Sequence, residues 1–118
     1  MSESRFLERV QEEILRHLSE IVEFEARDPA LRNAFPTVMD VRVSPDARNA
    51  KVYVALGEEV ENREKIILLF EKDRGFFRSR LAQRLVLRHT PELHFVLDET
   101  VERAMHLEHL LDEDRAEA

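Results

Sequence analysis

Two alternating segments joined by a short turn constrain the fold more than any other stretch of this chain. They are residues 37–43 (TVMDVRV) and residues 50–56 (AKVYVAL), and the turn between them is SPDARN. Because side chains alternate along a strand, one face is predicted to collect Thr37, Met39, Val41 and Val43, then Ala50, Val52, Val54 and Leu56. Proline, aspartate and asparagine in the turn favour chain reversal. The pattern predicts a β-hairpin whose apolar face another element must cover.

Helical periodicity surrounds the hairpin. Residues 4–27 carry apolar side chains at steps of three and four, which predicts an amphipathic helix that ends at Asp28-Pro29. Residues 29–36 are predicted to form a loop. After the hairpin, residues 61–73 are predicted to form a second helix.

A kink is predicted after this second helix. Gly75 is one of only two glycines, and glycine in a helix interior costs about 1 kcal/mol relative to alanine. We therefore expect a bend at Gly75 and a third helix over about residues 76–86, which Pro91 brings to an end. Residues 93–97 (LHFVL) predict a third strand, and residues 99–111 a short C-terminal helix.

The order α-β-β-α-kink-α-β predicts an α+β fold in which a three-stranded sheet packs against helices on one face. The 118 residues suit a single domain over residues 1–111, and the acidic residues 112–118 are expected to form a flexible tail. Cysteine is absent, which excludes a disulfide framework and fits a reducing cytoplasm. We expect neither a secretory signal nor a membrane partner, because no apolar run approaches the roughly 20 residues of a spanning helix.

Basic residues gather in one segment of an otherwise acidic chain. The formal net charge is −7, yet residues 74–90 (RGFFRSRLAQRLVLRHT) hold five arginines and no carboxylate. Guanidinium forks suit phosphate oxygens, so an acidic protein with such a segment can bind nucleic acid in one orientation. The other interpretation is a solvated face that keeps the domain soluble.

The arginines of the third helix border its predicted apolar stripe. Helical geometry places Arg80 and Arg84 on one side of that stripe and Arg78 on the other. Their aliphatic stems can cover the edges of the core while the guanidinium groups reach outward. The candidate RNA-binding residues are Arg74, Gly75, Arg78, Arg80, Arg84 and Arg88, together with Arg42 and Lys51 of the hairpin.

Patterns for catalysis and for metal binding are weak. His106 and His109 are spaced to share a helix face near Glu102 and Glu108, but no motif supplies a further ligand. No serine, histidine and acid form a recognisable nucleophile arrangement. Two glycines are too few for a P-loop or a dinucleotide fingerprint. We expect no catalytic residue, no metal and no cofactor.

Four stretches resemble the ribosome-binding factor A family, which comprises small bacterial ribosome assembly factors. They are the leading helix, the hairpin TVMDVRVSPDARNAKVYVAL, the segment RGFFRSRLAQRL after the bend, and LRHTPELHFVLDETVERA; together they cover about residues 5–110. The last stretch is the most specific. Its positions that match the family are Arg88, Pro91, Glu92, Leu93, Phe95 and Asp98.

The resemblance implies an RNA-binding domain similar to the type II KH fold. Ordinary KH domains clamp the nucleic-acid backbone with a GxxG loop, whereas this family has a kink written alanine-x-glycine. The matching kink positions are Asp73, Arg74 and Gly75, so Asp73 replaces the alanine. We expect Asp73 to lie near the apolar stripe of the second helix or to cap the third helix, since aspartate is a good N-cap.

The resemblance also implies a function. The protein is expected to bind 16S ribosomal RNA within the free 30S subunit and to assist late maturation, including 5′-end processing, as a cytoplasmic monomer without catalysis. Other assembly factors are further candidate partners. An alternative that the charge pattern leaves open is a protein-interaction module, in which the acidic first or C-terminal helix docks a basic partner and the arginines are structural.

Overall fold

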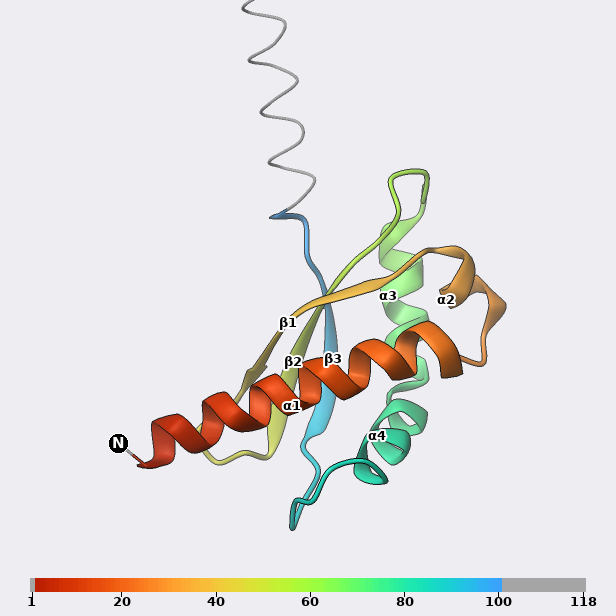
Figure 1. The fold of residues 1–118 in the computed structure, drawn as a ribbon. Coiled ribbons are helices and arrows are strands. Elements are labelled where there is room, and N and C mark those ends of the chain that lie inside the picture. The colour runs from red at the N-terminus through yellow and green to blue at the C-terminus, as the bar shows by residue number, and fades with distance from the viewer. Residues whose placement is uncertain (1, 101–118) are drawn as a thin grey trace, which may run out of the picture.

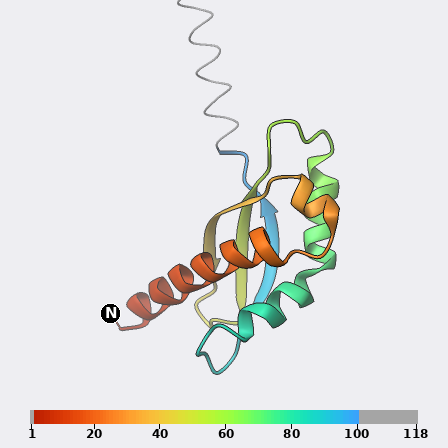
Figure 2. The same cartoon turned by 45° about the vertical axis from the view of Figure 1, so that its right-hand side comes forward.

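The computed structural model describes residues 2–100 and shows an α+β domain, as predicted (Figures 1 and 2). The elements in chain order are α1 (Ser2–Glu25), α2 (Pro29–Asn33), β1 (Thr37–Val43), β2 (Asn49–Ala55), α3 (Arg63–Lys72), α4 (Arg74–Ala82) and β3 (Glu92–Leu97). No helix in this part of the chain is long and apolar enough to cross a bilayer. All but the first two residues of the helix predicted over residues 99–111, and the whole tail 112–118, lie outside the described residues.

The sheet is mixed, with β2 in the centre. β1 pairs with β2 antiparallel, as the hairpin requires, and β3 pairs with the other side of β2 in parallel. The register sets Val41, Val52 and Phe95 side by side in one row across the three strands. All three side chains are buried, so this face of the sheet points toward the helices.

β1 contains an irregularity that the alternating pattern did not predict. The register shifts between Val38 and Asp40, which leaves Met39 as the extra residue of a β-bulge. Val38 is therefore buried, while Met39 is 40% exposed. The prediction that Thr37 and Met39 share the core face with Val41 was wrong. Because the bulge adds one residue to the strand, the residues before it point to the opposite face from the one that simple alternation predicts. The corresponding prediction for β2 is confirmed, since Ala50, Val52 and Val54, and Leu56 just after the strand, are all buried.

Helix α1 crosses the sheet, while α3 and α4 lie along β3 (Figures 1 and 2). α1 buries Val10, Ile14, Leu18 and Ile21, a stripe at steps of three and four. Phe70 of α3 and Phe77 of α4 meet Phe95 of β3, with ring centroids 5.0 Å and 5.5 Å from Phe95. Both helices are thus attached to the same strand by one aromatic cluster.

Side chains close the outer edges of the sheet at two points. The Gln11 amide oxygen of α1 accepts a hydrogen bond of 3.0 Å from the backbone N–H of Val43 on β1. On the opposite edge, the Glu71 carboxylate of α3 accepts from the backbone N–H of Phe95. Backbone donors that a neighbouring strand could otherwise use are therefore satisfied within the domain.

The break between α3 and α4 lies at Asp73 and not at Gly75. Asp73 has φ −92° and ψ 10° and separates the two helices, whereas Gly75 lies in the first turn of α4. Gly75 does not have a positive φ, and a Cβ added there would meet no atom within 4 Å. The prediction that Gly75 forms the bend was wrong: the backbone of Asp73 departs from helical geometry and Gly75 does not.

Two further boundaries differ from the sequence predictions. The predicted loop 29–36 contains the short helix α2, whose N-terminus is capped by Asp28 through a 2.9 Å hydrogen bond from the N–H of Ala30. Helix α4 ends at Ala82, earlier than the predicted residue 86. The remaining residues up to β3 form a connector, residues 83–91, that leads back to the sheet.

Candidate nucleic-acid interface

The arginines of residues 74–90 divide between two surfaces. Arg84 donates to Glu20 of α1 at 2.8 Å and also to Glu25, 64 and 59 residues away in the sequence. Arg80 lies 3.7 Å from the Glu25 carboxylate. We call these four residues the α1–α4 seam, which includes Arg84 just beyond the end of α4. Two arginines that were predicted to contact RNA are therefore paired with carboxylates of another helix.

Phe76 extends this network toward the helix break. The guanidinium carbon of Arg27 lies 4.2 Å above the Phe76 ring centroid, and that of Arg80 lies 5.2 Å from it. Arg27 also lies 3.6 Å from the Asp73 carboxylate. Asp73 occupies the N-cap position of α4, but its side chain makes no capping hydrogen bond there. The carboxylate of the substituted kink position is thus turned toward α1.

Arg78 and Arg74 have local partners. Arg78 donates to the carbonyl oxygen of Thr90 through its Nε at 3.1 Å and its Nη2 at 2.9 Å. This fork ties α4 to the connector. Arg74 pairs with Glu71 one turn earlier, at 3.4 Å. Both side chains are exposed, and each can accept additional anionic contacts from solvent.

A groove of about 730 Å³ opens where the connector passes the β1–β2 turn. Its walls come from Phe6 and Val10 of α1, residues 46–49 of the turn, Arg78 of α4, and residues 87–92. We call it the connector groove. Its basic residues Arg48, Arg78, Arg88 and His89 are all exposed. Asp46 and Glu92 contribute carboxylates to the same walls.

The face of the sheet turned away from the helices carries a second group of basic residues. The strand register places Arg42, Lys51 and His94 in one row, and Tyr53 lies in the next row. Arg42 pairs with Asp40 at 3.0 Å. The two hairpin residues predicted to bind RNA are therefore neighbours across β1 and β2.

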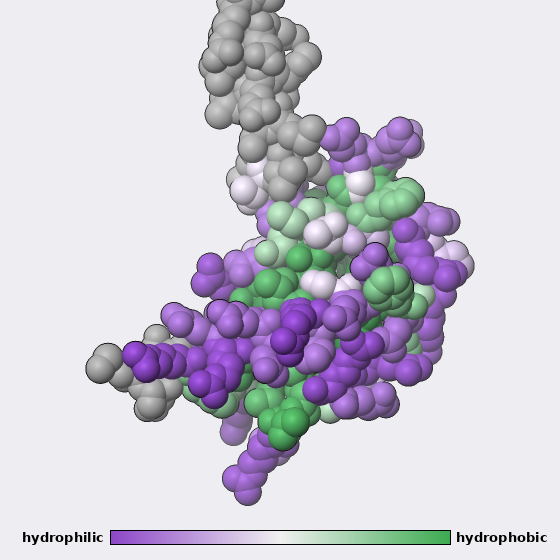
Figure 3. Space-filling model, in the orientation of Figure 1, coloured by the Kyte–Doolittle hydropathy of each residue, from purple (hydrophilic) through white to green (hydrophobic). Residues whose placement is uncertain are grey.

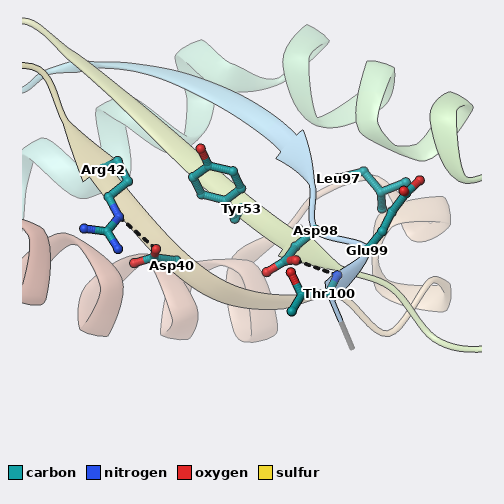
Figure 4. A pocket seen from close by; sticks show the side chains of 7 residues that line it. All are labelled: Asp40, Arg42, Tyr53, Leu97, Asp98, Glu99 and Thr100. Carbon is teal, nitrogen blue, oxygen red and sulfur yellow. Dashed lines mark hydrogen bonds and ion pairs between the residues drawn. The ribbon is translucent and has the colours of Figure 1, made fainter. Parts of the chain in front are cut away.

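Acidic residues follow this row toward the C-terminal end of β3. Figure 4 shows a pocket of about 430 Å³ with Tyr53 in its centre and Asp98, Glu99 and Thr100 at its far side. Asp98 accepts a 2.9 Å hydrogen bond from the backbone N–H of Thr100. With Asp40 opposite, this pocket favours cations over phosphates.

The described residues hold no cluster of three or more histidine or acidic side chains that could bind a metal ion. The candidate ligands His106 and His109, with Glu102 and Glu108, lie outside that part of the chain. Among the described carboxyl groups, that of Asp46 has a clearly shifted pKa. Hydrogen bonds from the Ser44 hydroxyl and then from the Arg48 backbone N–H lower this pKa below its usual 3.8. The pKa shift is caused by the structure of the β1–β2 turn, because both donors lie within that turn.

Comparison with known proteins identifies the fold and the family together. The sequence model of a family described as ribosome-binding factor A matches residues 7–111. The chain belongs to the ribosome-binding factor A family. A relative named ribosome-binding factor A from Alcanivorax borkumensis is 46% identical over 113 residues, which cover 93% of this chain and 80% of the relative. Another, from Methylobacillus flagellatus, is 42% identical over 106 residues, covering 90% and 82% of the two chains.

Solved structures of the ribosome-binding factor A family have the same fold. The crystal structure of the factor from Thermus thermophilus matches with a TM-score of 0.66 at 26% identity, covering 77% of this chain and 93% of the other. A homology model of the Thermus thermophilus factor, fitted into a cryo-EM map of its complex with the 30S subunit, matches with a TM-score of 0.61 at 27% identity and covers 75% and 90%. The α+β fold predicted from sequence is confirmed; the KH likeness agrees with the observed order and stays a prediction.

The RNA-binding role of the residues chosen from the sequence stays a prediction, but their placement is now known. Arg78 and Arg88 line the connector groove, Arg42 and Lys51 lie on the open sheet face, and Arg80 and Arg84 form the seam. Sequence reasoning missed Arg48, His89 and Phe6 as candidates. Arg48 was assigned to the turn and Phe6 to helix packing, although Phe6 lies one helical turn before the buried Val10 and is itself half exposed.

Proposed function

We propose that this protein binds the free 30S ribosomal subunit through 16S ribosomal RNA and assists late maturation of that subunit, including processing of the 5′ end of the RNA. Membership of the ribosome-binding factor A family carries the proposal, and a complex of the Thermus thermophilus relative with the 30S subunit supports it. The protein acts in the cytoplasm as a monomer. It selects an RNA conformation by binding and performs no covalent chemistry itself.

The charge distribution supports contact with RNA through limited parts of the surface. Arg88, Lys51 and Arg48 are exposed and lie on the connector groove or the open sheet face. Such side chains release condensed counterions when they meet phosphates, which supplies much of the affinity for nucleic acid. The acidic remainder of the surface repels RNA and so restricts the orientation of the bound protein.

Co-sedimentation with purified ribosomal particles tests the proposal. The wild-type protein is expected to pellet with free 30S subunits and to remain in the supernatant with assembled 70S ribosomes. Binding should weaken steeply as salt is raised, because several phosphate contacts contribute. Failure to sediment with either particle at low salt would refute the proposed function.

The paired seam arginines favour one element of the alternative function. Because Arg80 and Arg84 already contact Glu20 and Glu25, they are structural in the way a protein-interaction module would require. The outward side of α1 is largely hydrophilic (Figure 3) and includes the exposed Glu12 and Glu23. Replacing these two glutamates with glutamine separates the functions: a module that docks a basic protein partner loses binding, whereas 30S binding is unchanged or strengthened.

A further inference from the structure

The connector groove combines an exposed aromatic side chain, an apolar wall and several arginines, of which the sequence had marked only Arg78 and Arg88 as RNA-binding candidates. We propose that it binds an unpaired nucleotide of single-stranded RNA, with the base against Phe6 and Leu87 and the phosphate between Arg48 and Arg88. The inference rests on the proposed function and specifies where RNA is held. It adds a base contact to an interface otherwise described by phosphate contacts alone.

The dimensions of the groove suit such a ligand. Its volume of about 730 Å³ lies within the range of roughly 300–1,000 Å³ typical of small-ligand sites. Three regions that are distant in sequence form its walls: the start of α1, the β1–β2 turn, and α4 together with the connector that follows it. The groove is therefore produced by the tertiary fold.

One side of the groove is apolar. Phe6 is 50% exposed, and Leu87 is a partly buried side chain that packs against the core. Because the Phe6 ring is already half exposed beside the groove, a ligand can contact it without disturbing the packing of the core. Bases of any sequence stack on aromatic side chains, because every base has a π face.

The backbone that carries the cationic side chains is held in place before any ligand arrives. Arg48 belongs to a turn in which its backbone N–H donates to Asp46 at 3.1 Å, and its carbonyl oxygen accepts from the N–H of Glu92 at 2.8 Å. The fork from Arg78 to Thr90 fixes the connector two residues after Arg88. Such ordering reduces the conformational entropy lost on binding.

The charge of Arg48 helps to lower the pKa of Asp46, but within the described residues neither Arg48 nor Arg88 forms an ion pair with an acidic group of the groove. Asp46 already accepts hydrogen bonds from the Ser44 hydroxyl at 2.6 Å and from the Arg48 N–H, so its oxygens serve the turn. Glu92 is exposed at the rim. The arginine forks match phosphate geometry, and the adjacent aromatic wall matches a base joined to that phosphate. An acidic peptide would use the arginines but would leave Phe6 and Leu87 without a flat partner.

Fluorescence anisotropy with a labelled single-stranded RNA of about ten nucleotides tests the inference. Two groove variants, Phe6→Leu and Arg48→Gln/Arg88→Gln, are expected to weaken binding about 5- to 30-fold. The double variant should also reduce the slope of log affinity against log salt by about 0.7, since the two arginines hold one phosphate and each neutralised phosphate contributes about 0.7 for single strands. Phe6→Leu should leave that slope unchanged, because it removes a stacking surface and no charge.

Matched controls lie elsewhere on the surface. Phe24→Leu changes an exposed phenylalanine of the same helix, and Arg16→Gln/Arg32→Gln removes the same charge from sites outside the groove. Both controls should bind the RNA within about threefold of wild type. None of the substituted side chains is buried, so circular dichroism should show folded proteins throughout.

Three results of the anisotropy experiment would overturn the inference: groove variants that bind like their controls, a duplex RNA of equal length that binds as tightly as the single strand, or a poly-glutamate of equal charge that displaces the RNA as well as unlabelled RNA does. The last result would assign the groove to an acidic peptide. Sedimentation with 30S subunits separates the two proposals. If wild type and groove variants sediment equally, the groove inference fails and the proposed function stands; if wild type does not sediment, the proposed function fails.

Discussion

The α1–α4 seam and the connector groove use arginines of the same short segment for opposite purposes. In the seam, Arg84 and Arg80 meet carboxylates of α1. In the groove, only four residues beyond Arg84, Arg88 is exposed beside an aromatic wall. The difference arises from what the fold brings opposite each guanidinium. A run of arginines therefore marks a region, and the acidic residues of a distant helix decide which of its members remain available to a ligand.

The largest expected effect comes from removing the support that both regions share. Phe77 is fully buried between Phe70 and Phe95 and anchors α4 to β3. Phe77→Ala should lower the free energy of unfolding by about 3–5 kcal/mol, because it removes apolar contacts and leaves a cavity. Urea denaturation measures this value. A loss below about 1 kcal/mol would show that α4 is held mainly by the seam.

Charge reversal at two arginines four residues apart separates the regions directly. Arg84→Glu places a carboxylate beside Glu20 and Glu25 and should cost about 1–2 kcal/mol of stability, a value reduced by solvent because the Arg84 side chain is 32% exposed. Arg88→Glu should change stability by less than about 0.5 kcal/mol while abolishing most RNA binding. Denaturation curves for the pair check the contrast, which equal stability losses would contradict.

Neutralising the acidic side of the seam should release its arginines. Glu20→Gln/Glu25→Gln is expected to raise affinity for single-stranded RNA about threefold, because two internal competitors for the guanidinium groups are removed. The same change should lower stability by about 1 kcal/mol or less. Anisotropy titrations at constant salt provide the measurement, with Glu12→Gln/Glu23→Gln as a control for net charge. If the two double variants bind alike, the seam does not compete with RNA.

The smallest expected effect concerns pH at the rim of the groove. The Ser44 hydroxyl and the Arg48 N–H hold the pKa of Asp46 below 3.8, so the folded state prefers the carboxylate. The stabilisation is present above the unfolded-state pKa and is lost as pH falls through the lower folded-state value. Asp46→Asn should therefore flatten the acid side of the stability–pH profile slightly. An unchanged profile below about pH 4 would show that the turn does not depend on the charge.

The sequence predicted the arrangement of elements well where periodicity was strong. The α1 stripe, the β2 alternation and the third strand all appeared close to their expected positions, and the family was confirmed. The bulge at Met39 was not predictable from alternation, because Val38 and Met39 are both apolar and either could face the core. A local pattern contains no information on which of two adjacent apolar residues the partner strand will oppose.

The errors at the candidate site have the same origin in tertiary structure. Gly75 was expected to bend the chain because of its backbone freedom, but the break lies at Asp73, whose carboxylate faces Arg27, just beyond α1. The seam pairs join residues that are 55, 59 and 64 positions apart, so no helical periodicity could reveal them. The groove likewise requires the turn, the connector and α1 to be placed together before Arg48 and Phe6 become neighbours of one hollow.

The side-chain hydrogen bonds at the two sheet edges also bear on how the protein dissociates from a binding partner. Gln11 and Glu71 occupy backbone donors on β1 and β3, which discourages an incoming chain from extending the sheet through a ladder of main-chain hydrogen bonds. Association then depends on side chains whose contacts break one at a time and respond to ionic conditions. Dissociation from a partner would then not require a shared sheet to be separated.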